Sequence, residues 1–217
     1  MGRFRRRHTV ALWAAGTLGP TAFLEESIRT YRYDLWHDQP DHVEIWAEKD
    51  AIVSVLLDAA DPLRVQVMPF RGFTSLTSLY NAAMNFKDRI DEGKEISIYY
   101  FGDHDPSGVA IDAAAQKALR DDFDVDISFH RVAVTPQQIA QYNLPTRPTK
   151  ATDSRAKKFV GESVEIDAMP RDVLLDLVTS RIMLHLPADV MQRLEATERA
   201  QRASLQTVLD NLNRRTV

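Results

Sequence analysis

Stretches of the chain in which apolar residues recur with the period of a strand alternate with stretches in which they recur with the period of a helix. Val43, Glu44 and Ile45 alternate between apolar and polar side chains at the start of a strand-like run that ends before Glu48. Ile52, Val55, Leu56 and Ala59 then follow at helical spacing. Short runs rich in β-branched and aromatic residues predict further strands, and helical stretches separate them. These further strands are predicted at residues 65–70, 96–101 and 125–134.

Strands that alternate with helices form parallel sheets with helices on both faces. We therefore expect an α/β fold with a Rossmann-like core, in which a parallel sheet of about four strands is flanked by helices. Residues 171–186 carry an amphipathic stripe, and a further helix is predicted from Pro187, so a helical C-terminal extension should follow the core. The predicted division is an N-terminal arm at 1–40, the core at 41–170 and the C-terminal helices at 171–217.

Two carboxylates follow the strand predicted at residues 96–101. The strand breaks at Gly102, and Asp103 and Asp105 stand two residues apart, so their side chains can project to the same side. Pro106 suits the first turn of a helix, and Asp105 is placed to be its N-cap. The pair can converge on a cation, or Asp105 can cap the helix while Asp103 remains in solvent.

A third carboxylate is predicted at the same edge of the sheet. Glu48 ends the strand that contains residues 43–47, and the carboxyl ends of parallel strands meet at one edge, where ligands bind. Carboxylates held close together repel each other unless a proton or a cation lies between them. Mg²⁺ takes oxygen ligands, so Glu48, Asp103 and Asp105 form a candidate magnesium site in which Mn²⁺ is an alternative.

Four segments in this order resemble the TOPRIM domain, specifically that of the topoisomerase VI A subunit and the meiotic double-strand-break proteins. The resemblance covers roughly residues 43–170. It rests on a Glu-Lys-Asp-Ala run, a Gly-aromatic turn, an Asp-x-Asp-Pro-x-Gly segment and a Glu-Ile-x-Ala segment. In this chain they are Glu48–Ala51, Arg71–Phe73, Asp103–Gly108 and Glu165–Ala168.

The resemblance implies a metal-dependent enzyme that cleaves nucleic-acid phosphodiesters, as a nuclease or topoisomerase does. Asp103 and Asp105 would hold the metal, and Glu48 would share a metal or move a proton as general acid or base. Proteins of that family cleave DNA through a tyrosine in a separate winged-helix domain well upstream. About 40 residues precede the first predicted strand here, and they offer Tyr31 and Tyr33, for which packing roles are the alternative.

Two other functions remain open. The chain can be a non-catalytic DNA-binding or regulatory subunit that lacks the tyrosine-bearing cleavage domain. An Asp-x-Asp after a strand also resembles the haloacid-dehalogenase phosphotransferases, in which the first Asp is the nucleophile, although that family places the motif on its first strand. The partners expected from these functions are DNA, a second copy of the chain, or a separate cleavage or ATPase subunit.

The distribution of charge limits how nucleic acid can be bound. The formal net charge is −4, so contact with phosphates must be local. Arg71 follows the second strand at the acidic edge, and basic residues also crowd a short stretch after residue 146. Either set can neutralise a nucleic-acid backbone or lie on a solvated face. The candidate contacts are Arg71, Lys150, Arg155, Lys157 and Lys158.

Other features narrow the class of protein. The chain has no cysteine, which excludes disulfides and cysteine zinc sites, and no apolar run approaches the roughly 20 residues that span a bilayer. Residues 1–24 combine four arginines with an apolar stretch, which is typical of an export signal, a nucleic-acid arm or a remnant of an upstream domain. Because a magnesium site of this kind acts beside nucleic acid, we expect a cytoplasmic protein.

Overall fold

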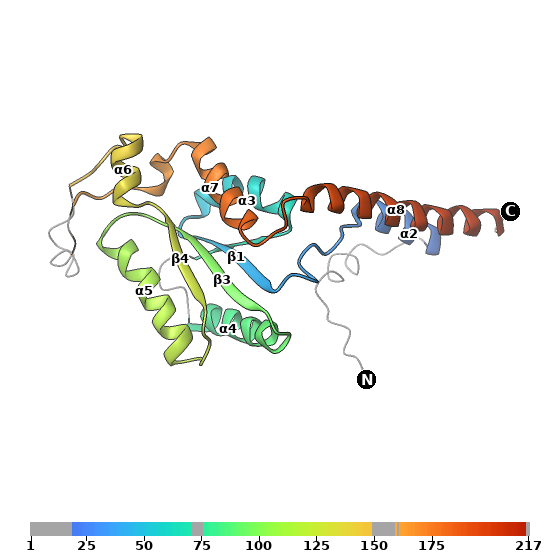
Figure 1. Cartoon of the computed structure of the whole chain (residues 1–217), viewed down its shortest axis with the longest axis horizontal. Coiled ribbons are helices and arrows are strands. Elements are labelled where there is room, and N and C mark those ends of the chain that lie inside the picture. Colours follow the sequence, from blue (N-terminus) through green and yellow to red (C-terminus); the bar gives the residue numbers. More distant parts are fainter. Residues whose placement is uncertain (1–18, 71–75, 149–158, 160, 216–217) are drawn as a thin grey trace. The chain divides into compact units, whose positions relative to one another are not determined.

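The structure of this protein is a computed structural model that describes residues 19–70, 76–148, 159 and 161–215. The chain divides into two compact units. The larger unit is Leu35–Pro187, and the described part of the smaller unit is residues 19–34 with 188–215 (Figure 1). Each unit is described by itself below.

A four-stranded parallel sheet forms the centre of the larger unit. Its strands are β1 (Asp41–Ala47), β2 (Gln66–Pro69), β3 (Glu95–Phe101) and β4 (Ser128–Ala133). They lie in the order β2-β1-β3-β4, and every neighbouring pair is parallel. The α/β class, the parallel sheet and the Rossmann-like arrangement predicted from the hydrophobic pattern are confirmed.

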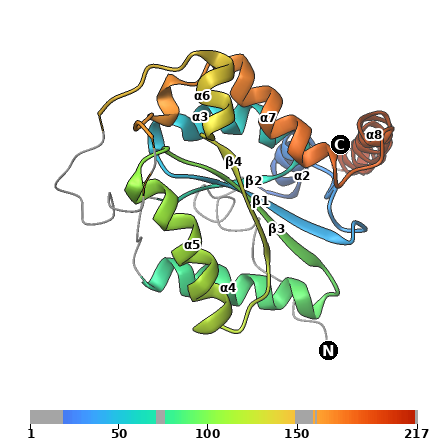
Figure 2. The same ribbon diagram turned by 60° about the vertical axis from the view of Figure 1, so that its left-hand side comes forward.

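Helices cover both faces of this sheet. Figure 2 shows α4 and α5 below the sheet, with α3 and α7 above it. Thr135 begins α6 with a capping box, in which Thr135 and Gln138 each bond the backbone N–H of the other. The helices are α3 (Asp50–Ala60), α4 (Leu76–Asp91), α5 (Pro106–Asp121), α6 (Pro136–Tyr142) and α7 (Arg171–Met183).

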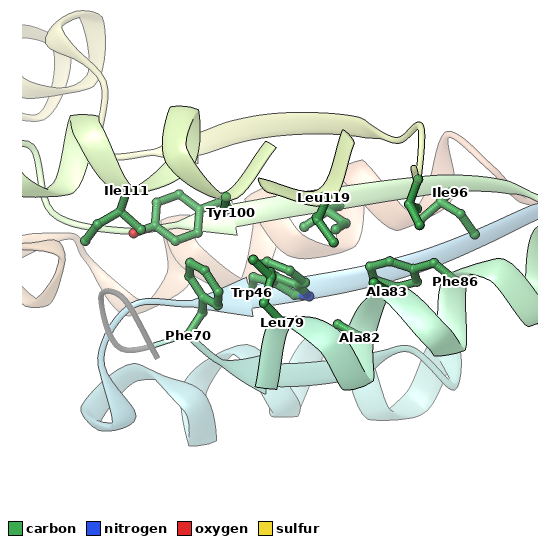
Figure 3. Packing of buried hydrophobic residues seen from close by; sticks show 13 residues of the cluster. Trp46, Phe70, Leu79, Ala82, Ala83, Phe86, Ile96, Tyr100, Ile111 and Leu119 are labelled. Carbon is green, nitrogen blue, oxygen red and sulfur yellow. The ribbon is translucent and has the colours of Figure 1, made fainter. Parts of the chain in front are cut away.

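Aromatic side chains fill the core between the sheet and the pair α4 and α5 (Figure 3). The ring of Trp46 stacks on Phe70 at 4.6 Å between centroids, and Tyr100 meets Phe70 edge to face at 6.3 Å. One carboxylate lies on the same face of β1: Glu44 is 2% exposed and accepts from Trp46 Nε1 at 3.0 Å, with His42 Nε2 at 3.1 Å. Each of its buried oxygens therefore has a polar partner.

Helix α7 belongs with the sheet, although the predicted boundary at residue 171 separated it. Leu174, Val178 and Ile182 are buried, and α7 packs on α3. Beyond the helix, His185 lies 3.0 Å from Asp41 Oδ2 and 2.8 Å from the Tyr99 hydroxyl, which ties this end to β1 and β3. The apolar stripe of α7 thus completes the core instead of forming an extension.

The smaller unit pairs two helices, α2 (Pro20–Thr30) and α8 (Val190–Arg215). The helix predicted from Pro187 thus begins at Val190. Hydrogen bonds join the residues after α2 to α8: the Tyr31 hydroxyl bonds Gln201, and the Tyr33 N–H donates to Glu198 Oε1 at 3.0 Å. The Tyr31 side chain therefore helps to pack this helix pair, and Tyr33 is tied to α8 through its backbone. No helix within the described ranges is long and apolar enough to cross a membrane.

Candidate functional site

The sheet carries Glu48 to the edge where the second strand tip lies. Hydrogen bonding of β1 continues past its last residue, because the Glu48 N–H donates to the Phe101 carbonyl at 2.9 Å. On the other side of Gly102, β4 continues the ladder, since Gly102 N bonds the Ala133 carbonyl at 2.8 Å. The predicted placement of Glu48 beside Asp103 at the carboxyl edge of the sheet is confirmed.

One oxygen of Glu48 is held by the neighbouring strand. Glu48 Oε2 accepts from the Asp103 backbone N–H at 2.7 Å and from the Tyr100 hydroxyl at 2.9 Å. Burial raises the pKa of Glu48, and the charges of Asp103 and Asp105 add to this rise, against the two hydrogen bonds. Burial also raises the pKa of Tyr100, so its hydroxyl remains a donor. A carboxyl that retains its proton more readily is suited to proton transfer.

Two glycines allow this close approach. A Cβ at Gly102 would overlap Glu48 Oε2 and would lie 2.6 Å from Tyr100 Cε1. A Cβ at Gly108 would collide with the Asp103 carbonyl, because the first turn of α5 packs directly on the strand tip. Both glycines of the Gly-Asp-x-Asp-Pro-x-Gly stretch are therefore required by packing.

Asp103 is 8% exposed and its two oxygens have different partners. Oδ1 accepts from the Ile166 backbone N–H at 2.8 Å, and Oδ2 lies 3.2 Å from Lys49 Nζ. Burial raises the pKa of Asp103 in spite of these two partners. The side chain is thus buried and paired at the strand tip, and the solvent-exposed alternative is wrong.

The fourth segment of the resemblance reaches the same place through Lys49. Lys49 Nζ also lies 3.3 Å from Glu165 Oε2 and 3.5 Å from Asp167 Oδ1. The chain around Glu165 forms a 3₁₀ turn, η3 (Ile166–Ala168), preceded by single bridges of His104 with Val164 and of Arg147 with Ser163. Asp103 and Lys49 together hold this turn against the strand tip.

Asp105 acts as the N-cap of α5, as predicted. Its Oδ1 accepts from the Gly108 N–H at 2.6 Å. Within the described ranges, Asp105 Oδ2 and Glu48 Oε1 have no hydrogen-bond partner, so each side chain keeps one oxygen for a ligand.

The donor chemistry of Glu48, Asp103 and Asp105 fits a hard cation, because each supplies a carboxylate oxygen. The positions of these three side chains match a metal site less well than their chemistry does. Among the described residues, no group of three His, Cys, Asp or Glu side chains is placed to hold a metal ion. The oxygen of Asp103 that faces the cluster contacts the Lys49 ammonium. The three-carboxylate metal site stays a prediction.

Arg131 on β4 is a site residue that the sequence patterns did not reveal. Its guanidinium donates to the carbonyls of Asp103 at 3.0 Å and Gly108 at 2.6 Å, and to Asp112 Oδ2 at 2.8 Å. It also lies over the Tyr100 ring, 5.1 Å from the centroid. The alternation that predicts β4 places Arg131 on the same face as Phe129, and a charged residue on that face was the available signal.

His104 lies between the two aspartates and faces another element. Its backbone pairs with Val164, and its ring lies 4.9 Å from that of Phe159. Burial and the charge of Arg131 lower the pKa of His104, so the ring favours the neutral form.

The other residues singled out from the sequence belong to other parts of the chain. Tyr31 and Tyr33 lie in the smaller unit. The nucleic-acid contacts predicted at Arg71, Lys150, Arg155, Lys157 and Lys158 lie outside the described residues. Comparison with models of protein families, with characterised proteins and with solved structures finds no match to this chain.

Proposed function

We propose that this protein is a Mg²⁺-dependent TOPRIM enzyme that acts on nucleic-acid phosphodiesters, with DNA as substrate. The observation that carries the proposal is the meeting of Glu48, Asp103 and the Glu165–Asp167 segment at one edge of a parallel sheet. These residues come from segments of the chain that are far apart, and all of them belong to the motifs that resemble this family. The same edge is where ligands bind in α/β folds.

Glu48, Asp103 and Asp105 would hold the metal ion. When bound, a metal ion at such a site stabilises the negative charge that develops on the phosphate and on the leaving oxygen. Glu48 has the environment of a general acid or base, because burial raises its pKa and Tyr100 orients it by a hydrogen bond. Arg131 fixes the backbone of the loop that carries both aspartates.

The test is cleavage of supercoiled plasmid with Mg²⁺, with Mn²⁺ and with EDTA. The variants are Asp103→Asn and Glu48→Gln, which preserve side-chain shape, beside Asp126→Asn as a matched control. Asp126 is an exposed carboxylate just before the amino end of β4, away from the acidic edge. We expect metal-dependent nicks or breaks with the wild-type and control proteins and loss of cutting with the two site variants.

Three results would contradict this proposal in different ways. If Asp103→Asn cuts as well as the wild-type protein, the carboxylates at this edge of the sheet take no part in the reaction. A gel shift without cutting would favour the non-catalytic DNA-binding subunit. Hydrolysis of small phosphomonoesters in place of plasmid would favour the phosphotransferase. Protease treatment of half of each sample, before electrophoresis, reports whether DNA ends become linked to protein through a tyrosine.

A further inference from the structure

We propose that Lys49 is the resident cation of the acidic site: its ammonium neutralises Asp103, Glu165 and Asp167 until a divalent cation displaces it. Lys49 therefore sets how tightly the site binds metal. This inference rests on the proposed function, because it assigns a role to one more residue of the same site.

The geometry around Lys49 is that of a cation among carboxylates. Its Nζ lies 3.2 Å from Asp103 Oδ2, 3.3 Å from Glu165 Oε2 and 3.5 Å from Asp167 Oδ1. The Lys49 side chain is 28% exposed, although lysine side chains usually extend into solvent. Burial by itself lowers the pKa of Lys49, but the charges and hydrogen bonds of Asp103 and Glu165 raise it overall, so the group is charged.

Asp103 is the point where the two cations compete. Its Oδ1 is directed to the Ile166 N–H, so Oδ2 is the oxygen that faces the cluster, and Lys49 already contacts it. A divalent cation on Oδ2 would place like charges within a few ångströms of each other at a partly buried site, which is unfavourable. Metal binding at Asp103 and the Lys49 contact are therefore mutually exclusive.

This competition predicts that replacing Lys49 increases the affinity of the site for metal ions, whereas most substitutions at a metal site decrease it. Removing a positively charged neighbour of a metal ligand should tighten metal binding, whereas removing a structural residue should weaken it. In Lys49→Met the carboxylates of Asp103, Glu165 and Asp167 lose the positive charge that neutralises them. The attraction of the site for a divalent cation therefore increases. We expect Mn²⁺ to bind about tenfold more tightly, the scale on which one adjacent charge shifts an ionic equilibrium.

The experiment is a titration of the full chain with Mn²⁺, in which electron paramagnetic resonance measures the concentration of the free ion at each step. Lys49→Met is compared with wild type, with Lys49→Arg, which keeps the charge, and with Lys117→Met. Lys117 is an exposed lysine that is paired with Asp121 on α5, so it controls for the general loss of one positive charge. We expect tighter binding in Lys49→Met and wild-type affinity in the other two variants.

The outcomes separate this inference from the proposed function. If wild type binds Mn²⁺ and Lys49→Met binds it equally or more weakly, the resident-cation role is wrong and the metal site stands. If no variant binds Mn²⁺, both fail.

A second measurement does not depend on the folding of Lys49→Met. Addition of Mg²⁺ to the ¹⁵N-labelled wild type should shift the Lys49 ammonium signal, which is identified by its loss in Lys49→Arg. An unmoved signal under saturating Mg²⁺ contradicts displacement.

Discussion

At the scale of single residues, the acidic edge is built from carboxylates that each serve structure with one oxygen. Glu48 uses Oε2 to accept from the Asp103 N–H, Asp103 uses Oδ1 for the Ile166 N–H, and Asp105 uses Oδ1 for the Gly108 N–H. Backbone donors of this kind fix a carboxylate in one orientation. The second oxygen of each side chain is then already oriented, so binding a partner there requires little further loss of side-chain entropy.

Gly102→Ala tests how closely Glu48 and Tyr100 approach the strand tip. The added methyl group would overlap Glu48 Oε2 and the Tyr100 ring, so we expect a loss of about 1–3 kcal/mol in the free energy of unfolding, the usual cost of overpacking. Urea denaturation measures it. In a Glu48→Ala background part of the overlap disappears, so the same substitution should cost less. Equal costs in both backgrounds would show that Glu48 does not approach Gly102.

His104 predicts a pH dependence of stability. Its pKa is lowered in the folded state by burial and by the charge of Arg131, so the unfolded chain binds the proton more readily. The free energy of unfolding should therefore decrease as the pH falls below about 6.5, by at most about 1.4 kcal/mol per pH unit.

The comparison is with His104→Phe, which keeps an aromatic ring against Phe159 and cannot titrate. Urea denaturation of both proteins between about pH 5 and pH 8 isolates the contribution of this histidine, because the other groups are shared. A constant difference between wild type and variant across this range would contradict the lowered pKa.

At the scale of elements, the β4 strand stabilises the loop between β3 and α5 through one side chain. Arg131 bonds the backbone carbonyls of Gly102, Asp103 and Gly108 and the carboxylate of Asp112 on α5. The Arg131 and Asp112 side chains are 16% and 15% exposed, so the pair is mostly shielded from water. The position of the acidic loop therefore depends on the neighbouring strand as well as on its own sequence.

Arg131→Met should lower the free energy of unfolding by about 3 kcal/mol, because Asp112 and the loop carbonyls lose a charged donor in a shielded place. Arg171→Met is the matched control, since Arg171 pairs with Asp58 at the surface and both side chains are more than half exposed. Its expected change is below about 1 kcal/mol. Similar losses in both variants, measured by urea denaturation, would contradict the role of Arg131.

The predicted elements agree with the structure where local pattern decides them. The runs at 65–70 and 96–101 became β2 and β3 because apolar residues must leave water, and Asp105 became a cap because α5 begins with Pro106. The chain at Glu165 forms a 3₁₀ turn and not a strand. There the Ile166 N–H bonds the Asp103 side chain, which replaces the strand partner that a ladder would require.

At the scale of the whole molecule, the net charge of −4 opposes contact with nucleic acid unless positive charge is concentrated. The candidate cluster of positive charge consists of Lys150, Arg155, Lys157 and Lys158. If these residues contact phosphates, binding must release counterions and weaken as salt increases. The proposed function thus makes a prediction about salt that is independent of cutting.

Replacing these four residues with alanine should weaken DNA binding and reduce the slope of log affinity against log salt by about 0.9 for each lost phosphate contact. Fluorescence anisotropy with a labelled duplex, over a series of salt concentrations, measures both. The control removes four exposed cations elsewhere on the larger unit and should leave the slope unchanged. These are Lys117, Arg120, Arg171 and Arg181. An equal fall in slope in the two proteins would make the effect one of net charge alone.

The α/β fold, the parallel sheet and the meeting of Glu48 with Asp103 at its carboxyl edge follow from the sequence, because strand and helix periods are local and the alternation of strands with helices makes the sheet parallel. Which charges neutralise one another at that edge depends on how the chain packs. Lys49 reaches carboxylates more than 50 and 110 positions away, and Arg131 holds a loop that precedes it by more than 20. Such pairings depend on distances that close only when the chain packs, so no pattern of neighbouring residues encodes them.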